Sequence, residues 1–394
     1  MWFIDIVKSF LPEFLWKNAL PKCLSIVLFL SLILNLFVTP SSSSSSLLVR
    51  VGVLSLFSPT EVAVKFNKRT VVVITKHGKS HQTVGENFQI LLVDGAMKVD
   101  NEYTDKFETS GAVSDFELSI PKRIKRRYLG RLEVFPDNKG AALTIVADIP
   151  IEEYVAGVVY SEMGDDAPSE AEKAMAVVAR SFVLSSLNRH AKDGYDFCDT
   201  THCAVYRGLD GGSRLARTRS ETMKTSGIIL TWQGETIKAF FHSTCGGRSH
   251  TPREVWGEDT VYPYRPVKCP YCAKAERFNW SAKIKKVDLL SVFLPEETGE
   301  ITLAWEGNKI EVSRNNAHLL LAREEFRLAI GRKLGWNLIF SPWFDFTDMG
   351  DSYEFKGRGF GHGVGLCEEG AMQMARKGFS WRAILSFYFP SASF

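Results

Sequence analysis

The residue best suited to acid–base chemistry is a glutamate at the end of an apolar run. Glu162 stands in "YSEMGDDAP", residues 160–168, directly before a turn that carries two aspartates and a proline. A glutamate that is partly removed from water has a raised pKa and can donate a proton near neutral pH, which is the task of a general acid. The same residue could be an ordinary solvated acid, and its neighbours in sequence do not decide between the two interpretations.

The cysteines outside the amino-terminal segment could form disulfides or bind a metal. They are Cys198, Cys203, Cys245, Cys269, Cys272 and Cys367. In an oxidising compartment an even number of cysteines is typical of disulfides. Zinc is the alternative, because Cys198, His202 and Cys203 lie close together and Cys269 and Cys272 form a Cys-x-x-Cys. Only one pair has the spacing of a structural zinc site, so disulfides are the favoured interpretation.

Two histidines lie in segments that allow close approach of a ligand. His362 is surrounded by glycines in "GRGFGHGVG", residues 357–365, and His242 precedes a Gly-Gly turn in "FFHSTCGG". Glycine clusters serve tight structural turns and binding loops alike. Each histidine could orient a substrate or bind a metal, or could simply be a satisfied histidine of a strand. Trp256 and Tyr264 could stack on sugar rings, although such aromatic side chains more often belong to a core.

Composition indicates a globular and nearly neutral protein. The chain has 394 residues, of which 45% are hydrophobic, and this is enough to bury a sizeable core. Its 48 basic and 45 acidic residues give a formal net charge of +3. This balance provides no broad basic field for nucleic-acid phosphates, so nucleic acid is not an expected partner.

The amino terminus is predicted to meet a membrane. An uncharged apolar run at 23–38 follows Lys17 and Lys22. Its length lies between that of a signal-peptide core and that of a bilayer-spanning helix, so residues 1–46 are expected to be a signal anchor or a signal peptide, followed by a serine linker. The lysines favour an anchor, and the serines at 41–46 would permit cleavage. In both cases the rest of the chain is expected outside the cytoplasm.

The remaining sequence predicts an α+β fold. Short alternating or β-branched runs, separated by turn residues, indicate an antiparallel β-rich region at 47–146. A mixed helix and strand domain is expected at 147–394, beginning with helical periodicity at 149–163 and 168–190. Glu162 is thus predicted at the end of one helix, facing the start of another. Further helices are predicted at 288–293 and 322–334.

The order of several motifs resembles the SpoIID family, which also contains the amidase enhancer LytB. They are "IPIEEYVAGVVYSEM", "AEKAMAVVARSFVL", "FCDTTHCAVYRG", "FFHSTCGG" with Glu254-Val255-Trp256, and "GRGFGHGVGLCEEGAMQMA" ending in "ILSFYFP". The resemblance covers roughly residues 147–394, and the ordered set is far more specific than any single motif.

This resemblance implies a lytic transglycosylase of the bacterial cell envelope. Such enzymes cut peptidoglycan glycan strands between N-acetylmuramic acid and N-acetylglucosamine and leave a 1,6-anhydro end. The catalytic acid of the family falls on Glu162. No cofactor is required for this chemistry, while the cysteines described above leave a structural zinc open. The residues expected to bind substrate are Arg180, Lys268, His242, Glu254 and His362.

The chain also departs from the family pattern. Gly164 and Asp165 widen the turn after Met163, and Glu368 stands where a glutamine is common. The first change could shift the carboxyl group of Glu162, and the second adds a charge beside the glycine-rich segment.

Three rival functions follow from these observations. The first is a non-catalytic peptidoglycan-binding protein that stimulates an N-acetylmuramoyl-L-alanine amidase, as the enhancer does. The second is a zinc hydrolase that uses some of the cysteines and histidines. The third is a structural protein of the envelope, in which replacing Glu162 would change only stability. The expected partners are therefore glycan strands, an amidase in the first of these rivals, and the membrane through the amino terminus.

Overall fold

The computed structural model describes residues 47–297 and 299–394. Helices make up 26% and strands 37% of the described residues, so the predicted α+β class is confirmed. The expected signal anchor or signal peptide at 1–46 lies outside the described residues. Within the part of the chain that the structure describes, every helix is too short or too polar to cross a bilayer.

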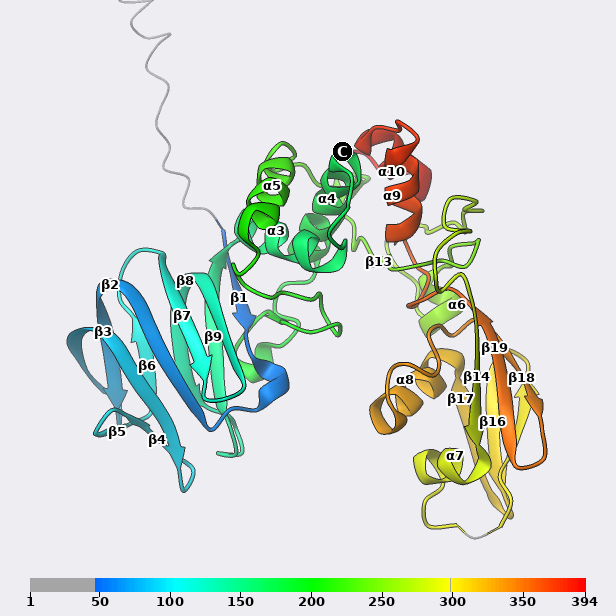
Figure 1. Cartoon of the computed structure of the whole chain (residues 1–394), viewed down its shortest axis with the longest axis horizontal. Coiled ribbons are helices and arrows are strands. Elements are labelled where there is room, and N and C mark those ends of the chain that lie inside the picture. The colour runs from blue at the N-terminus through cyan, green and yellow to red at the C-terminus, as the bar shows by residue number, and fades with distance from the viewer. Residues whose placement is uncertain (1–46, 298) are drawn as a thin grey trace, which may run out of the picture. The chain divides into compact units, whose positions relative to one another are not determined.

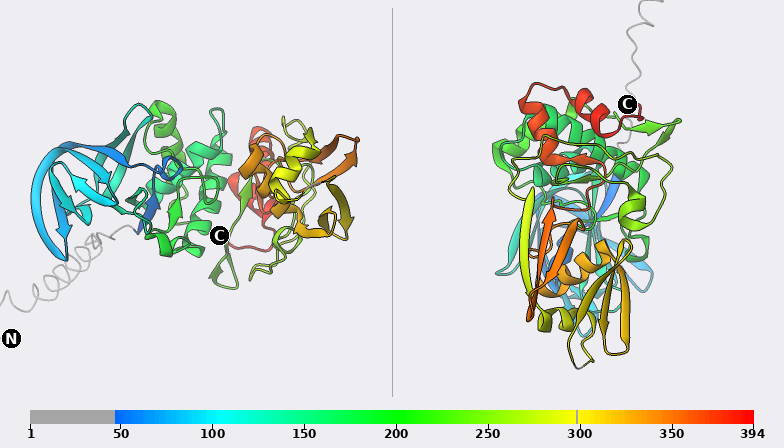
Figure 2. Two further views of the ribbon diagram at one scale, coloured as in Figure 1. Left: turned by 90° about the horizontal axis from the view of Figure 1, so that it is seen from below. Right: turned by 90° about the vertical axis from the view of Figure 1, so that its right-hand side faces the viewer.

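The amino-terminal half is built on a ten-stranded sheet (Figure 1). Its strands are β1 (Leu48–Gly52), β2 (Glu61–Lys76), β3 (Lys79–Val93), β4 (Ala96–Val99), β5 (Glu102–Thr104), β6 (Lys106–Thr109), β7 (Ser114–Ile120), β8 (Ile124–Pro136), β9 (Leu143–Pro150) and β10 (Phe197–Cys198). They run in the order β10-β1-β9-β8-β6-β2-β3-β4-β5, while β7 pairs with β2 and β8. The strands pair antiparallel except β1 and β10. Seen from below, the sheet is strongly curved (Figure 2).

Within the described residues, six helices accompany this sheet. They are α3 (Ile151–Glu162), α4 (Ser169–Ser185), α5 (Gly212–Met223), α6 (Pro252–Trp256), α9 (Glu368–Arg376) and α10 (Trp381–Tyr388). Of these, α3, α4, α9 and α10 contribute buried residues to the hydrophobic core of the sheet. Helix α4 contacts α3, α5, α9 and α10, so it lies at the centre of the group. Its buried positions Ala171, Met175, Val178 and Phe182 recur at three- and four-residue spacing, as predicted. Helix α3 ends before Gly164, whose φ of +72° only glycine adopts readily.

Short strands connect the helices. They are β11 (Thr231–Trp232), β12 (Glu235–Thr236), β13 (Phe241–His242) and β20 (Leu366–Cys367). Strand β13 pairs in parallel with β20, which joins the middle of the chain to the segment that enters α9.

Residues between α6 and β20 form a second hydrophobic core. The elements are β14 (Asn279–Lys285), α7 (Lys286–Phe293), β15 (Thr302–Glu306), β16 (Lys309–Arg314), β17 (Ala317–Ala322), α8 (Arg323–Leu334), β18 (Phe344–Asp348) and β19 (Ser352–Arg358). They make two three-stranded sheets, β14-β19-β18 and β15-β16-β17. Phe326, Phe344 and Phe355 lie at the centre of this core. The predicted helices α7 and α8 are present, whereas the separate core was not predicted.

Candidate active site and cysteine clusters

Glu162 is the last residue of α3 and contacts the segment that follows β10. The backbone N–H of Val205 donates a hydrogen bond to its Oε1 at 2.8 Å. Burial raises the pKa of Glu162, while the Val205 N–H and the positive charge of Arg207 act in the opposite direction. The net pKa is raised, so this partly buried carboxyl group can hold a proton above the ordinary range of a glutamate. Such a group is suited to protonating a ligand.

A second buried carboxyl group lies near Glu162. Glu368 is the first residue of α9 and is only 6% exposed. Burial raises the pKa of Glu368 well above its usual range, and the negative charge of Glu162 raises this pKa further. Helix α9 therefore brings a carboxyl group from far along the chain to Glu162. The sequence marked Glu368 as unusual but did not predict this proximity.

The glycine-rich segment 357–365 lies against the segment that contains β13. A Cβ atom on Gly365 would come to 2.1 Å from the carbonyl oxygen of Phe240, and the φ of Gly365 is +76°. Both the close approach and the dihedral angle therefore demand glycine. The segment leads directly into β20 and then into Glu368, so it positions this residue as well as His362.

His362, within this segment, lies close to His242 on β13. The Nδ1 of His242 donates to the carbonyl oxygen of Val364 at 3.0 Å, and burial lowers the pKa of His242 to about 4. The Nδ1 of His362 accepts from the N–H of Val364 at 3.0 Å. Burial also lowers the pKa of His362, so both rings are neutral near pH 7. Their centroids are 5.7 Å apart, and the ring of Trp256 lies 5.1 Å from that of His362.

Comparison with known proteins identifies the family of this chain. A sequence model of the SpoIID family, described as stage II sporulation protein, matches residues 139–232, which include Glu162. Stage II sporulation protein D of Bacillus subtilis (strain 168) is 31% identical over 263 residues, or 62% of this chain and 74% of that protein. The chain belongs to the SpoIID family.

Two further relatives agree with this assignment. Stage II sporulation protein D of Bacillus amyloliquefaciens is 31% identical over 264 residues, which are 62% of this chain and 74% of that protein. An amidase enhancer of Bacillus subtilis (strain 168) is 22% identical over 366 residues, which are 78% of this chain and 50% of the enhancer. These similarities support a cell-wall-related role for this SpoIID protein.

Arg180 does not lie beside Glu162 in the SpoIID fold but binds another glutamate. Its Nε and Nη2 donate to the two carboxylate oxygens of Glu152 at 2.9 and 2.6 Å, and its Nη1 donates to the carbonyl oxygen of Ile228 at 2.9 Å. The side chain is buried, and this ion pair ties α4 to α3. Substrate binding by Arg180 stays a prediction, whereas these contacts favour a role in positioning the helix that carries Glu162.

Glu254 and Lys268 also occupy different surroundings. The Oε2 of Glu254 accepts from the N–H of Thr251 at 2.8 Å and completes a capping box at the start of α6, and its Oε1 accepts from Arg248 at 2.8 Å. Lys268 is exposed on the loop that contains the Cys-x-x-Cys. Their predicted roles in substrate binding remain predictions.

The described cysteines are all free thiols, so the favoured disulfides are not formed. Instead they converge in two groups, of two and four cysteines. The smaller group joins Cys198, His202 and Cys203, as the alternative interpretation proposed, and adds His190, which sequence reasoning missed. The four ligand atoms lie within 4.8 Å of one another, and the Sγ of Cys203 is 3.4 Å from the Nε2 of His190.

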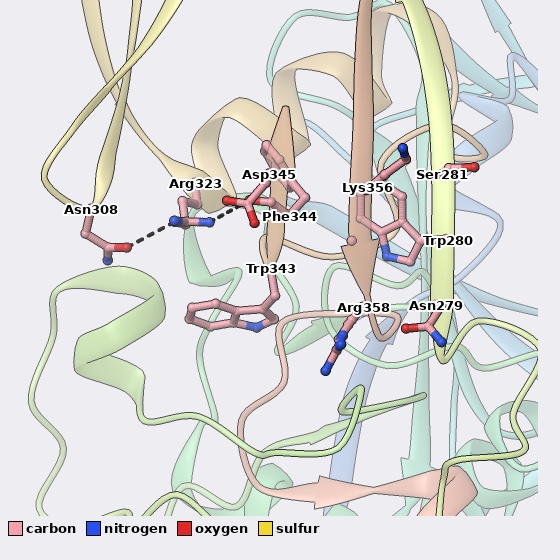
Figure 3. A pocket seen from close by; sticks show the side chains of 11 residues that line it. Asn279, Trp280, Ser281, Asn308, Arg323, Trp343, Phe344, Asp345, Lys356 and Arg358 are labelled. Carbon is pink, nitrogen blue, oxygen red and sulfur yellow. Dashed lines mark hydrogen bonds between the residues drawn. The ribbon is translucent and has the colours of Figure 1, made fainter. Parts of the chain in front are cut away.

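A solvent-open pocket of about 810 Å³ lies on the elements that form the second core rather than at Glu162 (Figure 3). Its lining combines aromatic side chains with cationic ones, among them Trp343, Arg323 and Arg358. The Nη1 of Arg323 donates to the carbonyl oxygen of Phe344 at 2.9 Å, which fixes the guanidinium at the rim. None of the predicted site residues lines this cavity.

Proposed function

We propose that this SpoIID protein is a lytic transglycosylase in which Glu162 is both the general acid and the general base. Glu162 protonates the glycosidic oxygen as the bond between this oxygen and C1 of N-acetylmuramic acid breaks. The C6 hydroxyl of the same sugar then attacks C1, and the Glu162 carboxylate takes the hydroxyl proton. The product is a 1,6-anhydro end, and the carboxyl group returns to its starting form.

The observation that carries this proposal is the environment of Glu162. Burial raises the pKa of Glu162, as a proton donor requires, and the Val205 N–H orients one of its oxygens. C1 is attacked by the sugar's own C6 hydroxyl group. The reaction therefore needs no second carboxylate to act as nucleophile or to activate water, unlike the reaction of a hydrolytic glycosidase. In this proposal the neutral ring of His362 and the half-buried Trp256 contact the sugar. The buried His242 holds the glycine-rich segment in place through Val364.

Peptide-free glycan strands provide the test. Wild-type protein is expected to release products with 1,6-anhydro ends, detected by mass spectrometry, and Glu162→Gln is expected to lower the rate by about 100- to 10,000-fold. Asp165→Asn is the matched control, because its exposed carboxylate pairs with Arg214 at the surface. Equal product formation by wild type and Glu162→Gln would refute the proposal.

An amidase-enhancing role without catalysis is the second candidate. The similarity to an amidase enhancer favours it. In that case the wild-type protein binds glycan strands without releasing anhydro products, and adding it to an N-acetylmuramoyl-L-alanine amidase raises the rate of the amidase. Glu162→Gln would leave this stimulation unchanged.

We also propose that His190, Cys198, His202 and Cys203 hold a structural zinc ion. Two thiolates and two imidazoles are a common ligand set for zinc, and four protein ligands leave no open position for catalysis. A chelator that removes this ion is expected to lower the melting temperature. Glycan cleavage measured before unfolding is expected to stay unchanged, which separates this role from that of a zinc hydrolase.

A further inference from the structure

Four cysteines from three distant parts of the chain meet beside α9. Cys245 follows β13, Cys269 and Cys272 lie in the loop after α6, and Cys367 is the N-cap of α9. All four are at most 3% exposed, and their sulfur atoms lie within 4.8 Å of one another. Four thiols from separate segments with their sulfur atoms gathered this closely match the ligand set of a structural metal site.

We infer that Cys245, Cys269, Cys272 and Cys367 form a zinc site distinct from the cluster at His190. Thiolates bind zinc at about 2.3 Å in a tetrahedron, which places the sulfur atoms about 3.8 Å apart. The sulfur atoms of Cys245 and Cys272 are 3.4 Å apart, so a single ion fits with small shifts. An iron–sulfur cluster would have to insert several iron and sulfide atoms among these sulfurs, and this spacing leaves no room for them.

Hydrogen-bond donors already face the sulfur atoms. The Sγ of Cys367 accepts from the N–H of Gly370 at 3.3 Å and from the N–H of Cys245 at 3.4 Å. The Sγ of Cys269 lies 3.2 Å from the hydroxyl group of Tyr388 on α10. Donors of this kind stabilise the thiolate form and orient metal ligands.

Gly370 provides the space that this arrangement requires. A Cβ atom at this position would lie 2.0 Å from the hydroxyl oxygen of Tyr388, 3.0 Å from the Sγ of Cys269 and 3.3 Å from the Sγ of Cys367. The first turn of α9 can approach the sulfur atoms only because residue 370 has no side chain. The four-cysteine site thus involves α9, α10 and two loops.

The ion would act as a structural clamp next to the proposed active site. Four cysteine ligands leave no coordination position for a substrate, so the zinc does no chemistry. Cys367 pairs with His242 across β13 and β20 and directly precedes Glu368. The clamp therefore fixes the junction between the glycine-rich segment and α9. Its existence does not depend on the activity of Glu162.

The other cysteine cluster allows a clean test. The full chain carrying Cys198→Ser and Cys203→Ser keeps only the four-cysteine site, and its zinc content and X-ray absorption spectrum are measured after purification in the presence of Zn²⁺. We expect one zinc ion per chain with four sulfur ligands at about 2.3 Å. Cys269→Ser with Cys272→Ser is the reciprocal variant and is expected to hold one zinc fewer than wild type.

The decisive measurement is made on the Cys198→Ser/Cys203→Ser protein, which keeps all four cysteines of the proposed site. It therefore does not depend on the folding of the reciprocal variant. The inference is overturned if Cys198→Ser/Cys203→Ser protein holds no zinc, holds zinc without four sulfur ligands, or holds iron instead. It is also overturned if peptide mapping without reduction finds a disulfide between any of the four cysteines. Loss of glycan cleavage alone would bear on the proposed function and not on this site.

Discussion

Val205 and Glu162 are joined by a hydrogen bond of 2.8 Å from a backbone N–H to Oε1. This contact ties the end of α3 to the segment after β10. Because the N–H occupies Oε1 as a donor, the proton of the neutral carboxyl group resides on Oε2. In the proposed mechanism, Oε2 is therefore the oxygen that delivers the proton.

Glycan cleavage should lose rate as the pH rises through the pKa of Glu162, because the first step needs the protonated acid. Burial raises this pKa, so the descending limb of kcat/KM against pH is expected above the ordinary glutamate range. The positive charge of Arg207 lowers the same pKa. Arg207→Met is therefore expected to move the limb to higher pH, and a shift to lower pH would contradict this assignment.

Replacing Glu162 should make the fold more stable at neutral pH. A carboxyl group whose folded-state pKa is raised contributes stability below its unfolded pKa, and this contribution is lost as the pH rises through the folded pKa. Glu162→Gln removes the titration and keeps an acceptor for Val205. Urea unfolding should thus show the variant more stable than wild type at pH 7, with a smaller difference at pH 4. A variant less stable at pH 7 would show that the carboxylate is favourably solvated.

Loss of the Arg180–Glu152 pair should destabilise the protein without weakening substrate binding. Arg180→Met leaves Glu152 without its partner in a largely buried position, a change that costs about 3–5 kcal/mol. The double variant Arg180→Met/Glu152→Leu should lose less than the sum of the single changes. For folded protein well below its melting temperature, KM for glycan strands is expected to be unchanged. A raised KM would instead support the substrate-binding role that the resemblance implies.

Gly365→Ala should destabilise the protein more than Gly378→Ala. Both glycines have positive φ, at +76° and +87°, so the dihedral strain is similar. Only at Gly365 would the new Cβ strike another atom, the carbonyl oxygen of Phe240, and overpacking of this kind costs about 1–3 kcal/mol. Thermal unfolding of the two variants measures the difference directly. Equal losses would mean that the segment shifts away without cost.

The helices and the candidate acid could be predicted because their signals are local. Helical periodicity and the turn at Gly164 place Glu162 at the end of α3. The capping box of α6 was also readable, since Thr251 and Pro252 precede Glu254 at the required spacing, and it would have indicated a structural role for this glutamate. Alternating strands between turns at 307–308 and 315–316 could likewise have signalled the second core.

The convergence of the cysteines could not be predicted in this way. Cys245 and Cys367 are 122 positions apart, and no local pattern states that they meet. Spacing alone shows one Cys-x-x-Cys and favours disulfide pairs. The pairing of β13 with β20 is what brings Cys245 and Cys367 together. Glu368 directly follows β20, so its position also depends on this long-range pairing. The sequence therefore marked Glu368 as unusual but could not predict that it lies near Glu162.

The packing of α9 against α4 has a consequence for protein synthesis. Arg376 on α9 bonds Asp166, which precedes α4 and was added to the chain 210 positions earlier. Contacts of such long range form late, because the ribosome must first release the downstream partner. The growing polypeptide therefore carries Glu162 without its neighbours from α9 until that helix has been synthesised, and the proposed active site is complete only after α9 has emerged.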